Sequence, residues 1–272
     1  MGSRRRRGLN QMLMVGGRGA PHTACAMTSL AIPEFFLVSA IFFAAGIVKG
    51  VLGMGLPTLA MGLLGLLMPV PHAAALLTLP SLATNVWQAC AGGGLRALVI
   101  RWWPLQVGIV LGVALAAWLP AQDDHAARRL LGACLLGYGL VGLAGRTLPA
   151  PPPRLHRRLG PVVGAATGVV TAFTGVFVLP AVPFLQSMQL RRQELAQALG
   201  LCFTTSTVAL GALLAARGQL ALGASIRSTL ALLPALAGMF VGQRVRDGMS
   251  EPWFRRCFFG GLVLLGAWQL MG

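Results

Sequence analysis

Long apolar runs separated by short polar breaks fill almost the whole chain. They lie near 33–50, 57–68, 73–91, 103–119 and 126–145, and then near 160–175, 177–188, 193–216, 223–243 and 253–271. Transmembrane β-strands show alternating segments of about ten residues, whereas these runs are continuous and rich in Leu, Ala, Val and Gly, which favours helices. The pattern predicts an all-α polytopic membrane protein with about eight transmembrane helices.

One polar segment divides the apolar runs into two sets. It is the segment LPAPPPRLHRR at Leu148–Arg158, which is rich in proline and arginine. Such composition is typical of a linker. We therefore expect a disordered N-terminal tail over 1–28, a first transmembrane repeat over 29–147, a linker over 148–158 and a second repeat over 159–272.

The two halves show a faint duplication. Gly46 and Gly53 match Gly168 and Gly175 at an offset of 122, Thr84 matches Thr204 at an offset of 120, Gly108 and Gly112 fall opposite Pro234 and Gly238, and Arg128–Arg129 falls opposite Arg255–Arg256 at an offset of 127. Chance matches are easy in Leu/Gly-rich sequence, so the order of the matches and their slowly growing offset carry the argument. Internal duplication is typical of secondary transporters, whose sites lie near the midplane between the repeats.

Each half opens on a run that glycine and proline interrupt. The interruptions are GVLGMGLP at Gly50–Pro57 and TGVFVLPAVP at Thr174–Pro183. Glycine and proline together loosen the helical hydrogen-bond ladder and free backbone N–H groups that lipid does not satisfy. A helix that restarts after such a break points its positive end at the gap, which favours an anion site. The alternative is that these glycines only permit close helix packing.

Lys49 is the only lysine in the chain, and it stands inside the first interrupted run. A cation near the bilayer interior costs about 2.5 to 3.5 kcal/mol on the insertion scale, so the ammonium must face a cavity, a partner or a substrate. The alternative is geometric. A helix that starts near Glu34 has risen about 22 Å by Lys49, and the flexible side chain then extends to the far interface.

A polar layer follows each interruption by about thirty residues. Ser81, Thr84, Asn85 and Gln88 form it in the first half, and Thr204, Thr205, Ser206 and Thr207 form it in the second. The first set recurs at three- and four-residue steps, so its members share one helix face. The stripe lines a pathway, or it makes hydrogen bonds between helices. The sequence leaves these two interpretations open.

Charge and composition restrict the class of protein further. Only 10% of the residues are charged, 56% are hydrophobic and the mean hydropathy is +0.74, which is typical of an integral membrane protein. The formal net charge is +16, but the arginines are scattered over the polar breaks without an aromatic platform, so we read them as topology signals and not as a nucleic-acid surface. Histidines and acids are too dispersed to predict a metal site, a cofactor or a catalytic centre.

The first interrupted run resembles a known signature. The motif Gly46-Ile-Val-Lys49-Gly50-Val-Leu-Gly53-Met-Gly55-Leu-Pro57 is similar to the glycine-rich opening of the sulfite exporter TauE/SafE family, and the resemblance extends over about 33–271. The resemblance implies export or uptake of sulfite, sulfonates, sulfoacetate or related organic anions, with no bound cofactor. The second copy departs from the pattern, because phenylalanines flank its glycine in the segment from Thr171 to Phe177.

We therefore expect a secondary transporter of a small anion in the cell inner membrane, and not an enzyme. The residues predicted to meet the anion are Lys49, Gly50, Gly53, Gly55, Pro57, Thr84, Asn85, Thr171, Thr174, Gly175, Thr204 and Thr205. A passive anion channel and a non-transporting membrane assembly protein are the alternatives. Proton coupling has only the family resemblance or His72 to support it, and the oligomeric state is open.

The positive-inside rule distinguishes two topologies, both with a cytoplasmic N-terminus. If each interrupted run crosses the membrane once, there are eight spans and both termini are cytoplasmic. If the second interrupted run returns instead, the C-terminus is outside and the halves are inverted. Loop arginines favour the second arrangement.

Overall fold

The computed structural model describes residues 32–271 except 121, 146–148, 221 and 249. The tail predicted for 1–28 lies outside the described residues. The chain separates into two compact units, 1–35 and 36–272. Of the first unit, residues 32–35 form the opening turn of α1, and all packing reported below lies within the second unit.

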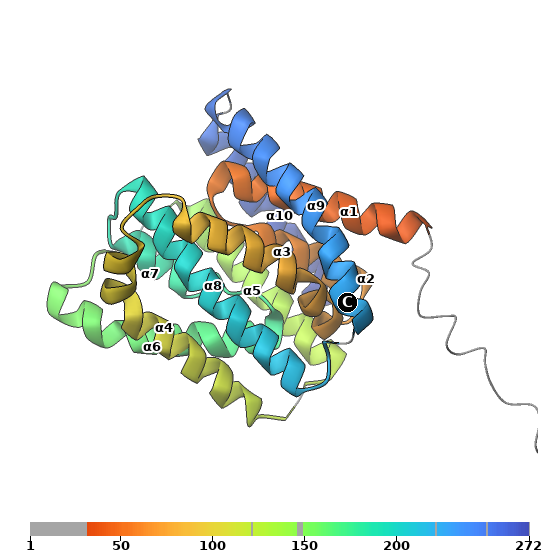
Figure 1. Ribbon diagram of the computed structural model, residues 1–272, viewed down its shortest axis with the longest axis horizontal. Helices are drawn as coiled ribbons and strands as arrows, with labels where there is room; N and C mark the ends of the chain where they lie inside the picture. Colours follow the sequence, from red (N-terminus) through yellow and green to blue (C-terminus); the bar gives the residue numbers. More distant parts are fainter. Residues whose placement is uncertain (1–31, 121, 146–148, 221, 249, 272) are drawn as a thin grey trace, which may run out of the picture. The chain divides into compact units, whose positions relative to one another are not determined.

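Eight described helices have 21 to 25 residues (Figure 1). They are α1 (Ile32–Leu52), α3 (Val70–Cys90), α4 (Leu95–Ala117), α5 (Asp124–Ala144), α6 (Pro153–Thr174), α8 (Arg192–Ala216), α9 (Leu222–Val245) and α10 (Glu251–Met271). A helix of this length spans about 30 Å, the thickness of the hydrocarbon core. Five of the eight also meet the apolarity expected of a membrane span. The prediction of a polytopic α-helical membrane protein is confirmed.

Two short helices interrupt this series. α2 (Leu56–Leu67) follows α1, and α7 (Ala181–Ser187) follows α6, so each half opens on a broken helix as predicted. A single-turn 3₁₀ helix, η1 (Arg246–Gly248), follows α9. The second break covers 175–180, inside the interruption predicted at Thr174–Pro183, and contains a cis Leu179–Pro180 bond. α7 therefore begins at Ala181, later than the start near 177 expected for the apolar run.

Two other helices begin earlier than the apolar runs indicate. α4 begins at Leu95, directly after the left-handed Gly94, and α6 begins at Pro153, inside the predicted linker. Arginine is a good helix former, so a helix can begin among the arginines that precede an apolar run. Proline is favoured in the first turn, where no intrahelical partner for its missing N–H is needed.

The first helix of each half packs against the fourth helix of the other half, with backbone touching backbone (Figure 1). A Cβ on Gly46 of α1 would collide with the carbonyl of Ala235 in α9, and a Cβ on Gly168 of α6 would collide with the carbonyl of Ile109 in α4. These two contacts are related by the offsets of 122 and 126 found in the sequence. Glycine at these positions lets helices approach closely in lipid.

The last helices of the two halves pack against each other in the same related way. A Cβ on Gly139 of α5 would lie 2.9 Å from the carbonyl oxygen of Phe259 in α10, and a Cβ on Gly266 would lie 2.6 Å from that of Gly132. An offset of 127 relates Gly139 to Gly266 and Gly132 to Phe259, so the two contacts are equivalent. The chain therefore contains two duplicated halves, α1–α5 and α6–α10.

Corresponding helices of the two halves run in opposite directions. The contacts Gly108–Pro161 and Gly112–Ala165 advance together along α4 and α6, so these helices are parallel. α3 and α8 are antiparallel, because Gly200 contacts Ala89 whereas Gly211, further along α8, contacts Thr78, which is earlier in α3. Since α4 is fourth in its half and α6 is first in its own, the halves are inverted relative to each other, as the second predicted topology requires.

The same contacts correct the predicted topology of the first break. α2 runs beside α10 in the same direction, from the pair Gly55–Phe258 to the pair Gly65–Gln269. α1, α3 and α5 end where α8 and α10 begin, around one cavity, and we call this end of the bundle the cavity end. α1 therefore runs toward the cavity end and α2 turns back from it, so the expectation of a single crossing by the first interrupted run is wrong. Within the second unit, α1 begins and α10 finishes on the side away from the cavity end. These two helix ends therefore lie on one side, so the second predicted topology, which puts the two termini on opposite sides, is wrong in this respect.

Candidate anion site

Lys49 lies in the last turn of α1 and is 3% exposed. Its Nζ donates a hydrogen bond to Oδ1 of Asn85 in α3. Among the residues that the structure describes, no carboxylate lies within 4.0 Å of this ammonium. The alternative in which Lys49 extends to the interface is therefore wrong. The structure shows a buried lysine amine beside which no described residue supplies a counter-charge.

Asn85 connects this cation to the second half. Its Nδ2 donates to Oγ1 of Thr207 in α8 at 3.2 Å, and Thr207 in turn donates to the carbonyl of Phe203 at 2.7 Å. Asn85 and Thr207 are both buried. The hydrogen-bond chain Lys49–Asn85–Thr207 thus joins α1, α3 and α8 across the two halves. These bonds agree with the interpretation in which the polar layer joins helices, and its role in lining a pathway stays a prediction.

The first break begins one turn beyond Lys49. Gly53 adopts φ +71° and its N–H donates to the carbonyl of Lys49 at 2.8 Å, which ends α1 in a left-handed cap. Gly55 adopts φ +104° and precedes α2, whose first turn contains the buried Pro57. Both glycines hold conformations that other residues rarely adopt, so the chain reverses here within a few residues.

Gln88 anchors this break to the second half. Its Nε2 lies 2.8 Å from the carbonyl oxygen of Gly53 and 2.8 Å from that of Ala196 in α8. Its buried Oε1 has no hydrogen-bond partner. Because Gln88 lies one turn from Asn85 on the same face of α3, the break and the lysine site share one supporting helix.

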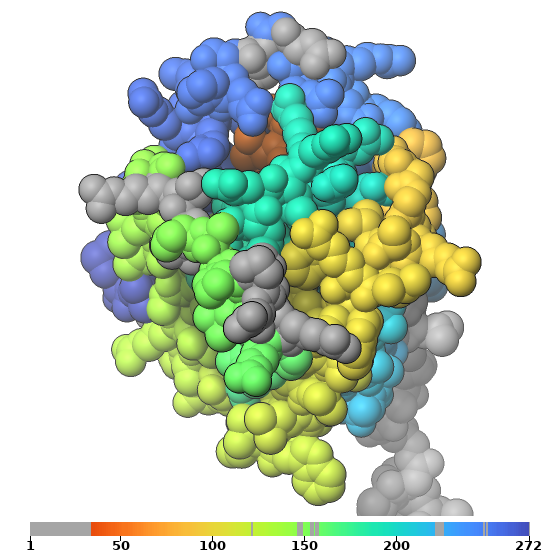
Figure 2. Space-filling model, turned by 90° about the vertical axis from the view of Figure 1, so that its left-hand side faces the viewer, coloured from red at the N-terminus to blue at the C-terminus, as the bar shows by residue number. Residues whose placement is uncertain are grey.

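A cavity of about 810 Å³ borders the first break. Residues 51–54 form one wall, and the end of α5 with the starts of α8 and α10 form the others. In Figure 2 an orange-brown segment of the α1 colour lies at the bottom of a hollow between the blue-green and blue parts of the chain. Much of the lining is apolar, from Leu52, Val141 and Leu199, among others.

Cationic side chains lie around the cavity. Arg192, Arg246 and Arg255 line it together with one acid, Glu251. Arg192 Nη2 forms an ion pair with Glu251 Oε2 at 3.1 Å, and the Arg255 guanidinium lies over the Phe259 ring at 5.9 Å from its centroid. Among the described lining residues, three arginines accompany one carboxylate, so positive charge predominates there.

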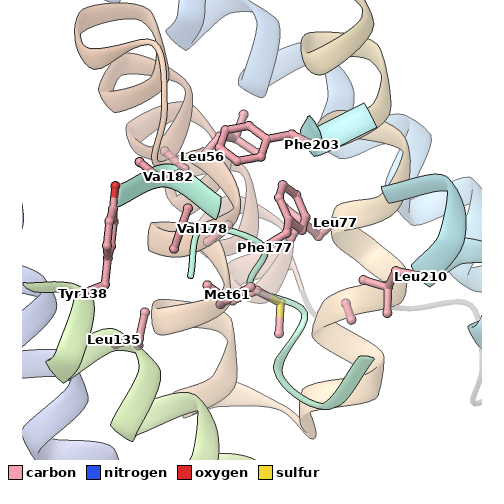
Figure 3. Close-up of a cluster of buried hydrophobic side chains, with 14 of the residues drawn as sticks. Leu56, Met61, Leu77, Leu135, Tyr138, Phe177, Val178, Val182, Phe203 and Leu210 are labelled. Atoms are coloured by element: carbon pink, nitrogen blue, oxygen red, sulfur yellow. The ribbon is translucent and has the colours of Figure 1, made fainter. Parts of the chain in front are cut away.

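The second break has a similar start and a different content. Gly175 adopts φ +67° and its N–H donates to the carbonyl of Thr171 at 2.9 Å. Val176, Phe177 and Val178 are then fully or almost fully buried, and the Phe177 ring lies 5.2 Å from that of Phe203. Figure 3 shows Phe177 and Val178 in the apolar cluster that also contains Met61, Leu77 and Phe203. Side chains fill this break.

The remaining predicted residues occupy separate places. Gly50 packs against the backbone of α9, as the close-packing alternative proposes. The hydroxyls of Thr84, Thr171, Thr174, Thr204 and Thr205 each donate to a carbonyl four residues earlier in their own helix. No hydrogen bond within the described residues joins them to Lys49. Of the predicted side chains, Lys49 and Asn85 are the two that a hydrogen bond brings together.

Sequence reasoning missed two parts of the site. Thr207 belongs to a run of four hydroxyl residues, and only helix packing selects it as the partner of Asn85. The cavity arginines were interpreted as topology signals and contacts to anionic lipid. The acidic Glu251 close to the arginines of the first turns of α10 could have indicated this cluster. Its pairing with Arg192 could not be predicted without knowing that the first turns of α8 and α10 lie side by side.

The sequence is similar to a known family of membrane proteins. The family described as Sulfite exporter TauE/SafE matches residues 38–268, which is most of the chain. A protein of Cupriavidus necator, named "Probable sulfite/organosulfonate exporter TauE", is 30% identical over 230 residues, covering 80% of this chain and 86% of its own length. No solved structure matches the chain. With inverted halves, broken opening helices and this family match over nearly its whole length, the chain belongs to the TauE/SafE family of membrane transporters and is not an enzyme.

Proposed function

We propose that this protein is a secondary transporter in the cell inner membrane that moves a small sulfur oxyanion or an organic sulfonate, with Lys49 holding the anion. The printed name of the Cupriavidus relative supports this class of substrate. The observation that carries the proposal is the ammonium of Lys49, buried at the end of α1 without a described counter-charge.

The ammonium is suited to a transient anion. Lys carries three donors, and Asn85 takes one of them. A buried charge is stable only when it is paired and hydrogen-bonded, and leaving one partner of a buried pair alone costs about 3 to 5 kcal/mol. An anion that arrives at Lys49 supplies the missing charge and binds the remaining donors.

Binding at Lys49 would also act on the relative position of the halves. The chain from Lys49 through Asn85 to Thr207 joins α1 and α3 of the first half to α8 of the second. An anion competes with Asn85 for the ammonium, so occupancy changes the strength of this connection. A ligand shifts a conformational equilibrium by its differential affinity for the two states, and this competition supplies such a difference.

The other predicted residues have supporting parts in the proposal. Gly53, Gly55 and Pro57 shape the break beside the lysine, and Gly50 and Gly175 allow close packing. In this state the hydroxyls of Thr84, Thr171, Thr174, Thr204 and Thr205 bond to their own helices. We retain them as substrate contacts in other states of the transport cycle.

Purified protein in proteoliposomes tests the proposal. Wild-type vesicles should take up sulfite or ethanesulfonate in a saturable manner, and excess substrate on the far side should accelerate exchange. Lys49→Met should lower the initial rate at least about 100-fold, whereas Lys49→Arg keeps the charge and should retain measurable flux. Undiminished flux through a correctly inserted Lys49→Met protein would refute the role of the cation.

The same vesicles separate the alternative functions. A passive channel would give flux without exchange stimulation, and an assembly protein would give neither flux nor stabilisation by the anions. Proton coupling is tested by imposing a pH gradient, which should drive accumulation against the anion gradient. His72, the titratable residue considered for this role, is exposed at the start of α3, about 20 Å from Asn85 along the helix.

A further inference from the structure

We propose that the cavity lined by Arg192, Arg246 and Arg255 is a second anion site, a vestibule that captures organic sulfonates with apolar tails before they reach Lys49. This inference rests on the proposed function, because the captured anion is the one to be transported. Nothing in the family match or in the relative's name assigns these arginines a role.

The size and lining of the cavity indicate an amphipathic ligand. Its volume of about 810 Å³ lies in the range of small-molecule sites, and a bare sulfite ion would fill a small part of it. Leu52, Val141 and Leu199 give it apolar walls, while the arginines form its charged rim. A charged sulfonate head and a short alkyl tail match both parts.

The charged groups are suited to a sulfonate head. A guanidinium presents a planar fork of donors that binds oxyanions in pairs of hydrogen bonds. Arg192 at the start of α8 and Arg255 in the second turn of α10 line the same cavity. Their positive charge attracts an anion from solution and fixes its head at the rim.

Glu251 acts as a built-in competitor for the arriving anion. Its carboxylate binds Arg192 at 3.1 Å and so ties the first turn of α8 to the first turn of α10. Both side chains are more than half exposed, so the pair is weak and exchangeable. A sulfonate that takes the place of Glu251 on Arg192 releases this tie between the two helix starts.

The vestibule adjoins the lysine site through one side chain. Gly53 and Ala196 line the cavity, and Gln88 holds both of their carbonyls. Gln88 stands one helical turn from Asn85, which binds Lys49. A shift of Gln88 therefore opens the direct way from the cavity to the buried ammonium.

Full-length protein in nanodiscs and in proteoliposomes provides the test, with 1-butanesulfonate, methanesulfonate and sulfite as probes. Arg255→Gln and Arg192→Gln should each raise the KM for 1-butanesulfonate about tenfold with little change in kcat. Glu251→Gln should lower the same KM, because it removes the competing carboxylate. Affinity measured by calorimetry should rise about fourfold for each methylene added to the tail.

Neighbouring arginines supply matched controls. Arg191 and Arg256 are exposed, carry the same charge and do not line the cavity. Arg191→Gln and Arg256→Gln should leave the KM within about twofold, since screened surface charges contribute little. Arg255→Lys keeps the charge without the fork and should fall between wild type and Arg255→Gln, which separates binding from a folding defect.

The outcomes distinguish the two proposals. If wild type moves none of the three probes, the proposed function fails. If wild type transports them and the cavity variants match their controls, or if 1-butanesulfonate and methanesulfonate bind equally, the vestibule fails and the transport function stands. Weaker binding in Glu251→Gln would also overturn the vestibule, because it would make Glu251 a support and not a competitor.

Discussion

The two breaks begin in the same way and differ in length and in what surrounds them. Each begins at a left-handed glycine, Gly53 with φ +71° and Gly175 with φ +67°, whose N–H closes onto the carbonyl four residues earlier. The first break then borders an arginine-lined cavity. The second is filled by Val176, Phe177 and Val178. The duplication thus repeats the left-handed glycine that starts each break. The volume of the side chains that follow decides which of the two breaks leaves space for a ligand.

The residues before the two breaks differ in the same sense. Lys49 and Thr171 occupy equivalent positions, since each offers the carbonyl that caps its helix. Lys49 reaches out to Asn85 on another helix, while Thr171 bonds back to Thr167 in its own helix at 2.7 Å. One half therefore supplies charge and space, and the other supplies a rigid packed wall.

The largest expected effect is on anion flux, and it should differ between substitutions at the equivalent positions Lys49 and Thr171. Lys49→Met should abolish anion flux, whereas Thr171→Val should lower it only about tenfold, because the valine keeps the shape and removes a neutral hydroxyl that in this state bonds to its own helix. Initial rates of ethanesulfonate uptake into proteoliposomes measure both. Equal losses in the two variants would show that both breaks bind substrate alike.

The next effect concerns stability. Phe177→Ala removes a fully packed ring from the second break and should cost about 3 kcal/mol. Met54→Ala at the first break should cost about 1 kcal/mol, because Met54 is only partly buried beside the cavity. Unfolding of detergent-solubilised protein, followed by tryptophan fluorescence, compares them. A larger loss from Met54→Ala would contradict the contrast between a filled and an open break.

A smaller effect is expected from the capping glycines. A Cβ at Gly175 would lie 2.9 Å from Met61 Cε, whereas a Cβ at Gly53 would meet nothing within 4 Å. Gly53→Ala should therefore cost only the left-handed conformation, about 1 kcal/mol, and Gly175→Ala about 2 kcal/mol because crowding adds to it. The same unfolding assay measures both variants, and equal costs would mean that the space beside Gly53 is closed in solution.

The smallest perturbation is a topology reporter, which should leave transport unchanged. Among the described residues, arginines gather at the cavity end, in the starts of α4, α8 and α10 and in η1, so the positive-inside rule puts this end in the cytoplasm. This orientation makes the start of α1 periplasmic, the reverse of the cytoplasmic start assumed for both topologies in the sequence analysis. A reporter fused after α10 should then be periplasmic, because α10 runs away from the cavity end. A cytoplasmic reporter would place the cavity on the periplasmic side and reverse the direction in which the vestibule loads.

Much of the fold was predictable because its signals are local. The length of each apolar run measures a span, and glycine or proline marks each break without reference to the rest of the chain. The errors lay where local signals stop. Arg96 and Arg101 lie before the apolar run predicted to start near 103, but helix α4 already begins at Leu95 and includes both. No local signal showed that α2 turns back alongside α10.

The candidate site was predictable only in part. Lys49 and Asn85 were named because a lone cation and an amide are conspicuous in apolar sequence, and the structure joins them. The predicted hydroxyls on Thr171 and Thr204 bond to their own helices, as the hydroxyl of a threonine within a helix readily does. Composition does not reveal whether a hydroxyl faces its own backbone or a neighbour.

The order of residues alone was enough to establish membrane helices, two related halves, two broken openings and a cation that lipid does not tolerate alone, since each follows from hydrophobicity and backbone stereochemistry over a few turns. Packing between distant segments decided the rest. It inverted the halves, gave Lys49 its partners on α3 and α8, filled one break and left the other beside a cavity ringed by arginines from separate helices. Those outcomes depend on which helices meet, and helices far apart in the chain meet only in the folded protein.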